Sequence, residues 1–418
     1  MDANFATVLS ALMSKDNQTR KNAEAYFTET LKSNLVPTLD TLVAIFTSPS
    51  NDLILRSFSG ILIRRAVDNY AEKMTPEQTH VFREKMLAMW ASESNALLLQ
   101  RLSHIIAQSS LKSPWEELIP KVVQFSSAAN SKSLIAVLGL IEIISEYCPE
   151  DIQANLPILG PFLGQFISSS DKDVQISCAK TTGACIICLE DENSRNAFKP
   201  AVQPIVQVLS VALTDENETD ATKIMSYLVT IAQEQPNFFK GTLDAVVGAM
   251  LTVAHAQGLE FSTRAMALEL MVTITETAPA LARRCHGLVQ GIVPLAMSLS
   301  LEIEEEEAEW AAGPYTEEPS DENCAVGDEA IERIATGLGG KSIAEPILML
   351  VQQYSLPEQD YKHRRAAVAA FCRLAEGSAK YFKKFMSQAL PFLTAALQDS
   401  SAKVKFEGIQ VRIFQFLL

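Results

Sequence analysis

Apolar residues along the chain recur at three- and four-residue spacing, which is the period of one buried helix face. Leu268, Met271, Val272, Thr275 and Ala278 show this spacing in one segment. Two such segments and a short break form a unit that recurs about every 40 to 47 residues, the period of HEAT repeats. The pattern predicts an all-α fold, a right-handed α-solenoid (superhelix) of about ten HEAT repeats with the last one incomplete.

The first helix of several repeats is expected to carry a proline in its first turn, where the missing N–H costs least. These prolines are Pro120, Pro157, Pro204, Pro294, Pro346 and Pro391. The expected first helices include Leu35 to Phe46, Glu117 to Phe125, Leu156 to Ile167, Val202 to Leu213, Leu243 to Ala254, Leu288 to Leu299, Ile343 to Tyr354 and Met386 to Leu397.

The second helices are expected to begin at an acidic or small capping residue, as at Asp16, Asp171, Asp220, Asp360 and Asp399. Small alanines within them let paired helices approach closely. The expected second helices are 17–31, 51–70, 93–110, 130–147, 172–189, 218–235, 260–279, 323–340 and 358–377.

One connection departs from the repeat pattern. From Glu302 to Glu322 the chain is rich in carboxylates and contains no Lys or Arg. Such a block repels itself and cannot build a core, so we expect an exposed, mobile loop. The prediction divides the chain into N-terminal repeats (1–301), an acidic loop insertion (302–322) and further repeats (323–418).

Composition narrows the classes of partner. The formal net charge of -15 argues against a protein that tracks nucleic-acid phosphates and favours basic protein partners. Seven cysteines, an odd number lying mostly in apolar helical stretches, indicate reduced core thiols. The N-terminus lacks the features of a secretory signal, and no apolar stretch reaches the roughly 20 residues that a membrane span requires. No membrane partner is expected.

Several motifs resemble the importin-β (karyopherin-β) family of nuclear transport receptors, in its importin 5 or importin beta-3 branch. Asp16-Asn17 followed by Arg20-Lys21 and Ala23-Glu24 resembles the family's opening repeat. The acidic stretch followed by Ala325 to Ala330, Gly337 to Lys341, Tyr361 to Arg364 and Ala375 to Gly377 is the most specific match. Family members are well over twice as long, so the resemblance implies the N-terminal part of such a receptor.

The resemblance implies a monomer that shuttles between cytoplasm and nucleus through the nuclear pore. Its implied partners are Ran-GTP, basic cargo proteins with a nuclear localisation signal, and the phenylalanine-glycine repeats of nucleoporins. The implied Ran contacts in the acidic loop are Glu304, Glu305, Glu306, Glu307, Glu309 and Trp310; those on an N-terminal inner helix are Arg56, Arg64 and Arg65. The implied cargo-binding carboxylates are Asp328, Glu329, Glu332 and Glu376.

Each of these sites has a plainer interpretation. The acidic stretch, whose charges would steer a basic partner over a Debye length of about 8 to 10 Å, could also be a solvated charge run. Trp310 could anchor a partner or cover its neighbours. The inner-helix carboxylates and arginines could be ordinary solvent-facing charge. A constitutive HEAT-repeat scaffold or adaptor subunit without Ran dependence is the competing hypothesis, and it predicts binding that ignores nucleotide state.

No catalytic set emerges from the sequence, so we expect neither an enzyme nor a cofactor. Gly337 to Ser342 lacks the first glycine of a phosphate-binding loop and is better explained as a helix cap. The Cys185 and Cys188 pair has no second pair or spaced histidine to complete a zinc site. Cys285 and His286 are adjacent on a helix, point about 100° apart and cannot share a proton.

Overall fold

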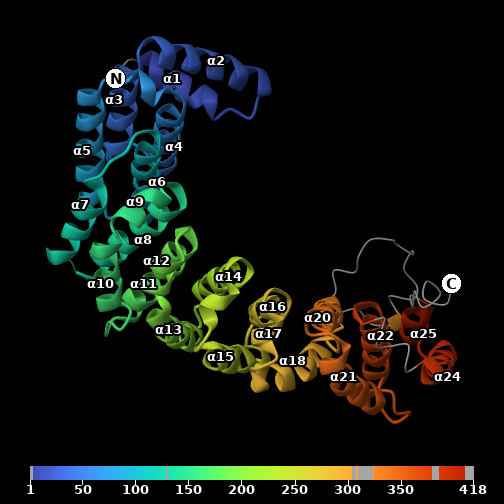
Figure 1. Cartoon of the computed structure of the whole chain (residues 1–418). Coiled ribbons are helices and arrows are strands. Elements are labelled where there is room, and N and C mark those ends of the chain that lie inside the picture. Colours follow the sequence, from blue (N-terminus) through green and yellow to red (C-terminus); the bar gives the residue numbers. More distant parts are fainter. Residues whose placement is uncertain (1–2, 129, 304–306, 309–322, 379–385, 410–418) are drawn as a thin grey trace. The chain divides into compact units, whose positions relative to one another are not determined.

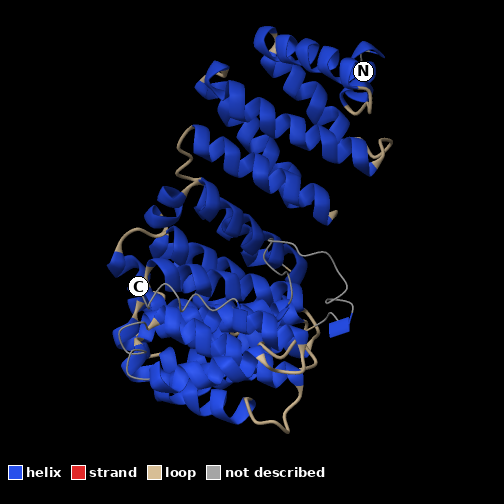
Figure 2. Cartoon of the chain, turned by 90° about the vertical axis from the view of Figure 1, so that its right-hand side faces the viewer, coloured by secondary structure: helices blue, strands red, loops and turns tan. Residues whose placement is uncertain are grey.

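The computed structural model describes residues 3–128, 130–303, 307–308, 323–378 and 386–409. Every regular element within these ranges is a helix, and Figure 2 shows no strand among them. The predicted all-α class is confirmed. None of the described helices is both long enough and apolar enough to cross a membrane.

The chain forms two compact units, residues 1–194 and 195–418, each a stack of antiparallel helix pairs (Figure 1). The pairs of the first unit are α1 (Ala3–Leu12) with α2 (Asn17–Ser33), α3 (Leu35–Thr47) with α4 (Leu53–Tyr70), α5 (Pro76–Ser92) with α6 (Ala96–Lys112), α7 (Leu118–Gln124) with α8 (Ser131–Tyr147), and α10 (Leu156–Phe166) with α11 (Lys172–Cys188). Short elements link them: η1 (Ala71–Lys73), η2 (Phe125–Ala128) and α9 (Pro149–Ala154).

The second unit continues the same arrangement. Its pairs are α13 (Val202–Thr214) with α14 (Glu218–Glu234), α15 (Leu243–His255) with α16 (Phe261–Thr277), α18 (His286–Leu299) with α20 (Asn323–Leu338), α21 (Gly340–Tyr354) with α22 (Tyr361–Gly377), and α24 (Met386–Leu397) with α25 (Ala402–Ile409). The linking elements are α12 (Glu192–Asn196), η3 (Lys199–Ala201), η4 (Pro236–Phe239) and α17 (Pro279–Ala282). The acidic stretch lies between α18 and α20, which nevertheless pack together as one pair.

Within each unit the second helices of successive pairs lie side by side and form one face, which we call the second-helix face. In the first unit α4 packs on α6, α6 on α8 and α8 on α11. In the second, α14 packs on α16, α16 on α20, α20 on α22 and α22 on α25. The seams are closed by fully buried apolar side chains such as Leu42, Ile63, Leu102, Leu268 and Ile331. Each pair therefore covers the apolar stripe of the next.

Capping residues begin the second helices largely where the sequence predicts. Asp16, Asp171 and Asp360 each accept a hydrogen bond from a backbone N–H in the first turn. The prediction for Asp220 is wrong: it lies inside the first turn of α14, and Asn217 caps that helix by accepting from the Asp220 N–H at 3.2 Å. Asparagine and aspartate are equally good caps, so composition alone could not choose between them.

Three of the prolines lie deeper in their helices than predicted. Pro157 does sit in the first turn of α10. Pro294, Pro346 and Pro391, however, are interior residues of α18, α21 and α24. α18 and α21 begin two and three residues earlier than expected, and at all three prolines the packing of the pair holds the helix despite a missing N–H.

The glycine segment after α20 ends that helix, as predicted. Gly339 has φ +78°, the left-handed conformation that favours glycine, and its N–H bonds to the Ala335 carbonyl at 3.0 Å. Gly337 has a second role that the sequence did not show. A Cβ at this position would lie 2.5 Å from the Thr275 carbonyl oxygen, so its absence lets α20 approach α16 closely.

Candidate protein-binding surfaces

The beginning of the acidic stretch is fastened to the second unit. The two oxygens of Glu302 accept a bidentate pair of hydrogen bonds from Arg264 at the start of α16, one of them 2.7 Å long. This contact raises the pKa of the buried Arg264 guanidinium. The carbonyl of Ile303 then accepts from the Lys362 ammonium on α22 at 3.0 Å.

Glu307 serves a structural purpose as well. Its carboxylate accepts from the Ala402 N–H at 2.5 Å and so caps α25. Hydrogen bonds from Ser401 and from this backbone lower the pKa of Glu307. The other predicted Ran contacts of the stretch lie outside the described residues: Glu304, Glu305, Glu306, Glu309 and Trp310.

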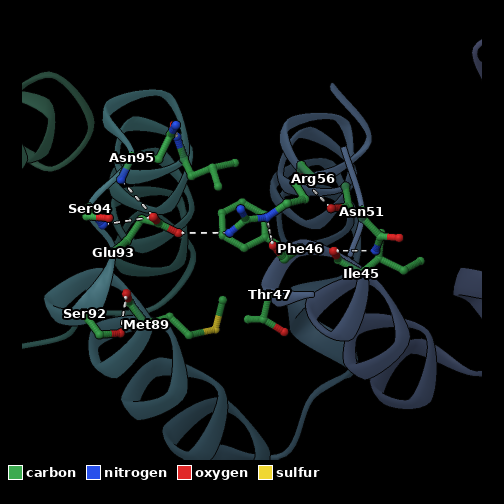
Figure 3. Close-up of polar contacts among 12 residues, drawn as sticks. Ile45, Phe46, Thr47, Asn51, Arg56, Met89, Ser92, Glu93, Ser94 and Asn95 are labelled. Carbon is green, nitrogen blue, oxygen red and sulfur yellow. Dashed lines mark hydrogen bonds and ion pairs between the residues drawn. The ribbon is translucent and has the colours of Figure 1, made fainter. Parts of the chain in front are cut away.

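Arg56, one of the predicted Ran contacts, is engaged within the chain and only partly exposed. Its Nε donates to the Phe46 carbonyl at 2.7 Å, and its Nη2 lies 3.3 Å from Glu93 Oε2 (Figure 3). Glu93 in turn accepts from the backbone N–H groups of Ser94 and Asn95, both at 2.9 Å. Arg56 therefore ties the end of α3 to the turn between α5 and α6, a contact between repeats that sequence spacing does not reveal.

Arg64 and Arg65 are exposed on α4, as the prediction requires. Arg64 Nη1 lies 3.4 Å from the Tyr147 hydroxyl on α8, and that hydroxyl lies 3.3 Å from His104 Nδ1 on α6. Burial, together with the charges of Arg64 and Arg101, lowers the pKa of His104. These polar contacts link three neighbouring second helices, α4, α6 and α8.

An apolar hollow that the sequence reading missed lies on the same face of the first unit. It has a volume of about 300 Å³ and is formed by the first half of α4, the first turn of α6 and the residue that follows α1. Ile54 at its rim is 67% exposed, and Leu53 and Ile61 are also exposed. The available signal was the pair Leu53-Ile54 directly after the capping Asp52, ahead of the buried stripe of α4. The full lining is Met13, Leu53, Ile54, Ser57, Phe58, Ile61 and Leu97.

The second-helix face of the second unit carries a ladder of ion pairs between helices. Arg333 on α20 is held by Glu269 and Glu276 of α16, with four hydrogen bonds of 2.6 to 2.9 Å. These two glutamates are missing from the predicted set. Their seven-residue spacing, two helical turns, placed them on one face, and this was the signal that could have found them.

Asp328 must be removed from the predicted cargo-binding carboxylates. It is only 3% exposed, and its side chain is paired with Arg365 of α22. Glu407 of α25 lies 3.2 Å from the same guanidinium. Although burial opposes the charge, the two carboxylates raise the pKa of Arg365, whereas burial raises the pKa of Glu407. This cluster joins three helices inside the unit, because a carboxylate so deeply buried needs a charged partner.

The remaining predicted carboxylates lie at the surface. Glu329 is exposed on α20, and Glu332 is partly exposed one turn further along. Glu376 on α22 shares Arg373 with Glu332, so the structure brings these two carboxylates together with a cation between them. Among the described residues no group of three or more His, Cys, Asp or Glu is arranged to hold a metal ion. Burial raises the pKa of Cys178 and Cys188 to about 12, which keeps both thiols protonated and unreactive.

Stacked antiparallel helix pairs whose second helices line one face define a class of protein, the HEAT-repeat solenoids. Two family models match, one described as IPO5-like, TPR repeats over residues 98–249 and one described as Importin repeat over residues 256–345. The two models together match 242 of the 418 residues, and with the curated relatives below they show that the chain belongs to the importin-β family.

The curated relatives are distant but match over nearly the whole chain. Importin subunit beta-3 of Saccharomyces cerevisiae is 23% identical over 421 residues, covering 96% of this chain and 38% of that protein. A probable importin-5 homolog of Dictyostelium discoideum is 21% identical, covering 90% of this chain and 36% of that protein. The chain therefore spans less than half the length of these relatives.

Solved structures share the fold. The crystal structure of Kap121p superposes with a TM-score of 0.83 at 21% identity, over 98% of this chain and 40% of that one. Kap121p bound to RanGTP gives 0.84 at 20% identity, over 98% and 39%. The fold prediction is thus confirmed. The prediction that the chain is not an enzyme is supported by the family, whose HEAT-repeat transport receptors are not catalytic.

Proposed function

We propose that this chain is part of a nuclear transport receptor that binds Ran in its GTP form with its first unit and a basic cargo segment with its second unit. The observation that carries the proposal is the match of almost the whole chain to Kap121p, a protein whose crystal structures include complexes with RanGTP, Pho4p, Ste12p and Nup53p. Passage would use phenylalanine-glycine repeats at the nuclear pore, and the chain would shuttle as a monomer.

The Ran-binding surface that the geometry favours differs from the one expected from arginines alone. Arg56 is occupied by Phe46 and Glu93, whereas Arg64 and Arg65 remain exposed on α4. The apolar hollow begins on the same helix, at Leu53 and Ile54. Exposed apolar side chains rimmed by charge are typical of protein-binding sites, so we assign the hollow to the Ran surface together with the two arginines.

The cargo-binding surface is the row of carboxylates on α16, α20 and α22. The carboxylates of this surface outnumber the two arginines between them, Arg333 and Arg373, so the net charge of the group is negative. The carboxylates are Glu269, Glu276, Glu329, Glu332 and Glu376. Lysine side chains of an extended segment would find carboxylates on successive helices. A surface that binds through several spaced charges suits a cargo with an extended basic segment better than a cargo with a folded apolar surface.

Immobilised Ran, loaded with GTP or with GDP, tests the first half of the proposal. We expect retention of the chain by the GTP form only. Ile54→Asp should weaken that binding at least tenfold, because a carboxylate would be forced into an apolar contact (about 1.4 kcal/mol or more). Val81→Asp is the matched control: Val81 is 61% exposed on α5 and lies outside the hollow, so its loss should leave binding unchanged.

Equal retention of the two nucleotide forms would reject the transport-receptor proposal and favour the scaffold alternative. Retention of Ran-GTP that survives Ile54→Asp unchanged would reject only the assignment of the hollow.

A further inference from the structure

Two of the glutamates that we assign to cargo, Glu332 and Glu376, already hold a cation of the chain itself. Arg373 Nη1 lies 3.0 Å from Glu376 Oε2 and 3.5 Å from Glu332 Oε2, bridging α22 to α20. The three side chains are 36%, 24% and 41% exposed respectively, so water and a ligand can reach all of them. The guanidinium thus occupies the position that a lysine of a bound segment would need.

The neighbouring arginine of the ladder shows what a firmly held guanidinium looks like. Arg333 uses both of its Nη atoms and its Nε in four hydrogen bonds to Glu269 and Glu276, all of 2.9 Å or less. Arg373 makes two contacts through one nitrogen, and the one to Glu332 is long. The two arginine side chains are about equally exposed, at 35% and 36%, so the difference lies in geometry: paired hydrogen bonds on both sides are stronger than single-point contacts through one nitrogen. Arg373 is therefore the easier of the two to displace.

We propose that Arg373 is an intramolecular competitor for basic cargo: it occupies the Glu332–Glu376 position and must swing away before a cargo ammonium can enter. The proposal rests on the proposed cargo site and adds its regulation. Because the site is open only while Arg373 is displaced, the apparent dissociation constant equals the intrinsic one divided by the open fraction. Weakly basic segments are therefore rejected. Segments with several well-placed lysines still bind, because their other contacts offset the free energy needed to displace Arg373.

The test measures binding of a fluorescein-labelled peptide with lysines at every third or fourth position to the full chain by fluorescence anisotropy. Arg373→Gln should tighten binding about three- to tenfold, since the open fraction rises to unity. Arg373→Lys, which keeps the charge and loses the fork geometry, should give a smaller gain. Melting curves followed by circular dichroism check that each variant is folded.

Removing any positive charge from the chain would raise its affinity for a basic peptide somewhat. Two controls separate this general effect from the loss of the competitor. Lys405→Gln removes an exposed charge from α25, the next second helix after α22, and should change affinity less than twofold. In the background Glu332→Gln with Glu376→Gln, Arg373→Gln should give no gain, because the position it vacates no longer attracts a cation.

The outcomes are separable. A loss of peptide binding in Glu332→Gln with Glu376→Gln, combined with an unchanged or weaker affinity in Arg373→Gln, would overturn the competitor and leave the cargo site standing. A gain in Arg373→Gln that persists in the double-glutamine background, or that Lys405→Gln matches, would also overturn it. Peptide binding that ignores the double-glutamine change would reject the cargo site itself, and the competitor with it.

Discussion

At the scale of single residues, many of the charged side chains form contacts that hold the fold together. Arg56, Arg264 and Arg365 each join helices of different repeats, and Asp328 and Glu307 serve the same purpose. The sequence spacing could place these residues on helices, but it could not identify the residue that each one contacts. That depends on the register between repeats about 40 residues apart, which no local pattern encodes. Predicted site residues such as Arg65 and Glu329 have exposed side chains that the fold does not use in this way.

Arg83 gives the strongest example of a charge used for structure. It is 7% exposed, and its guanidinium donates to Ser109 Oγ at 3.1 Å, to the Ser109 carbonyl at 2.7 Å and to the Pro114 carbonyl at 3.3 Å. It also stacks 4.8 Å from the centre of the Trp115 ring. The arginine thereby holds the turn between α6 and α7, whose carbonyls have no helical partner.

Arg83→Leu should lower the free energy of unfolding by about 3 kcal/mol, because it leaves these buried acceptors without donors. Urea denaturation followed by circular dichroism measures the change. Lys85→Leu is the control on the same helix: Lys85 forms only a surface ion pair with Asp40, so we expect a change within about 0.5 kcal/mol. Equal effects of the two substitutions would show that Arg83 is not a structural anchor.

At the scale of elements, the helix pairs follow closely from the apolar period and from capping residues. The second helices begin within a few residues of their predicted starts, and α10, α13 and α24 begin where expected. The exceptions are physical. Interior prolines in α18 and α21 show that packing on a partner helix can outweigh a lost hydrogen bond, so proline alone does not mark a helix start. The close approach of α16 and α20 at Gly337 likewise depends on how two neighbouring second helices pack, which the sequence of either helix alone does not show.

Gly337→Ala should destabilise the second unit by about 2 to 3 kcal/mol, because the new methyl group cannot occupy a point 2.5 Å from the Thr275 carbonyl and the helices must separate. Thermal unfolding and urea titration report the loss. Gly248 on α15 is the matched control, since a Cβ there meets no atom within 4 Å. Gly248→Ala should be neutral or stabilise by up to about 1 kcal/mol through helix propensity. A Gly337→Ala variant as stable as Gly248→Ala would contradict the close packing.

At the scale of the whole molecule, the repeat period was sufficient to predict an all-helical array and its number of pairs, because each pair contacts only its neighbours. The division into units at residues 194 and 195 was not predicted. Only a short acidic run, Glu190 to Glu192, precedes this boundary, and it falls in a chain segment with ordinary repeat spacing. The two boundaries predicted at either end of 302–322 both fall inside the second unit.

The acidic stretch is considered with the whole molecule because its electrostatic field extends beyond the residues that it contacts. Glu302 and Glu307 are engaged by Arg264 and by the start of α25, so a test of steering has to spare them. Five carboxylates further along can be changed to amides without touching either contact: Glu309, Glu317, Glu318, Asp321 and Glu322. This amide variant lowers the negative charge by five while keeping the chain length.

We expect the amide variant to associate with Ran-GTP about tenfold more slowly at low salt in stopped-flow measurements, because a concentrated negative field speeds encounter with a basic patch. The rates of variant and parent should converge near roughly 0.5 M salt, where screening acts over a few ångströms. Changing Glu72, Glu77, Glu116, Glu345 and Glu358 to Gln gives the same net charge with the stretch intact, and should slow association far less. Equal slowing by both variants would mean that only total charge matters, and that the stretch has no steering role of its own.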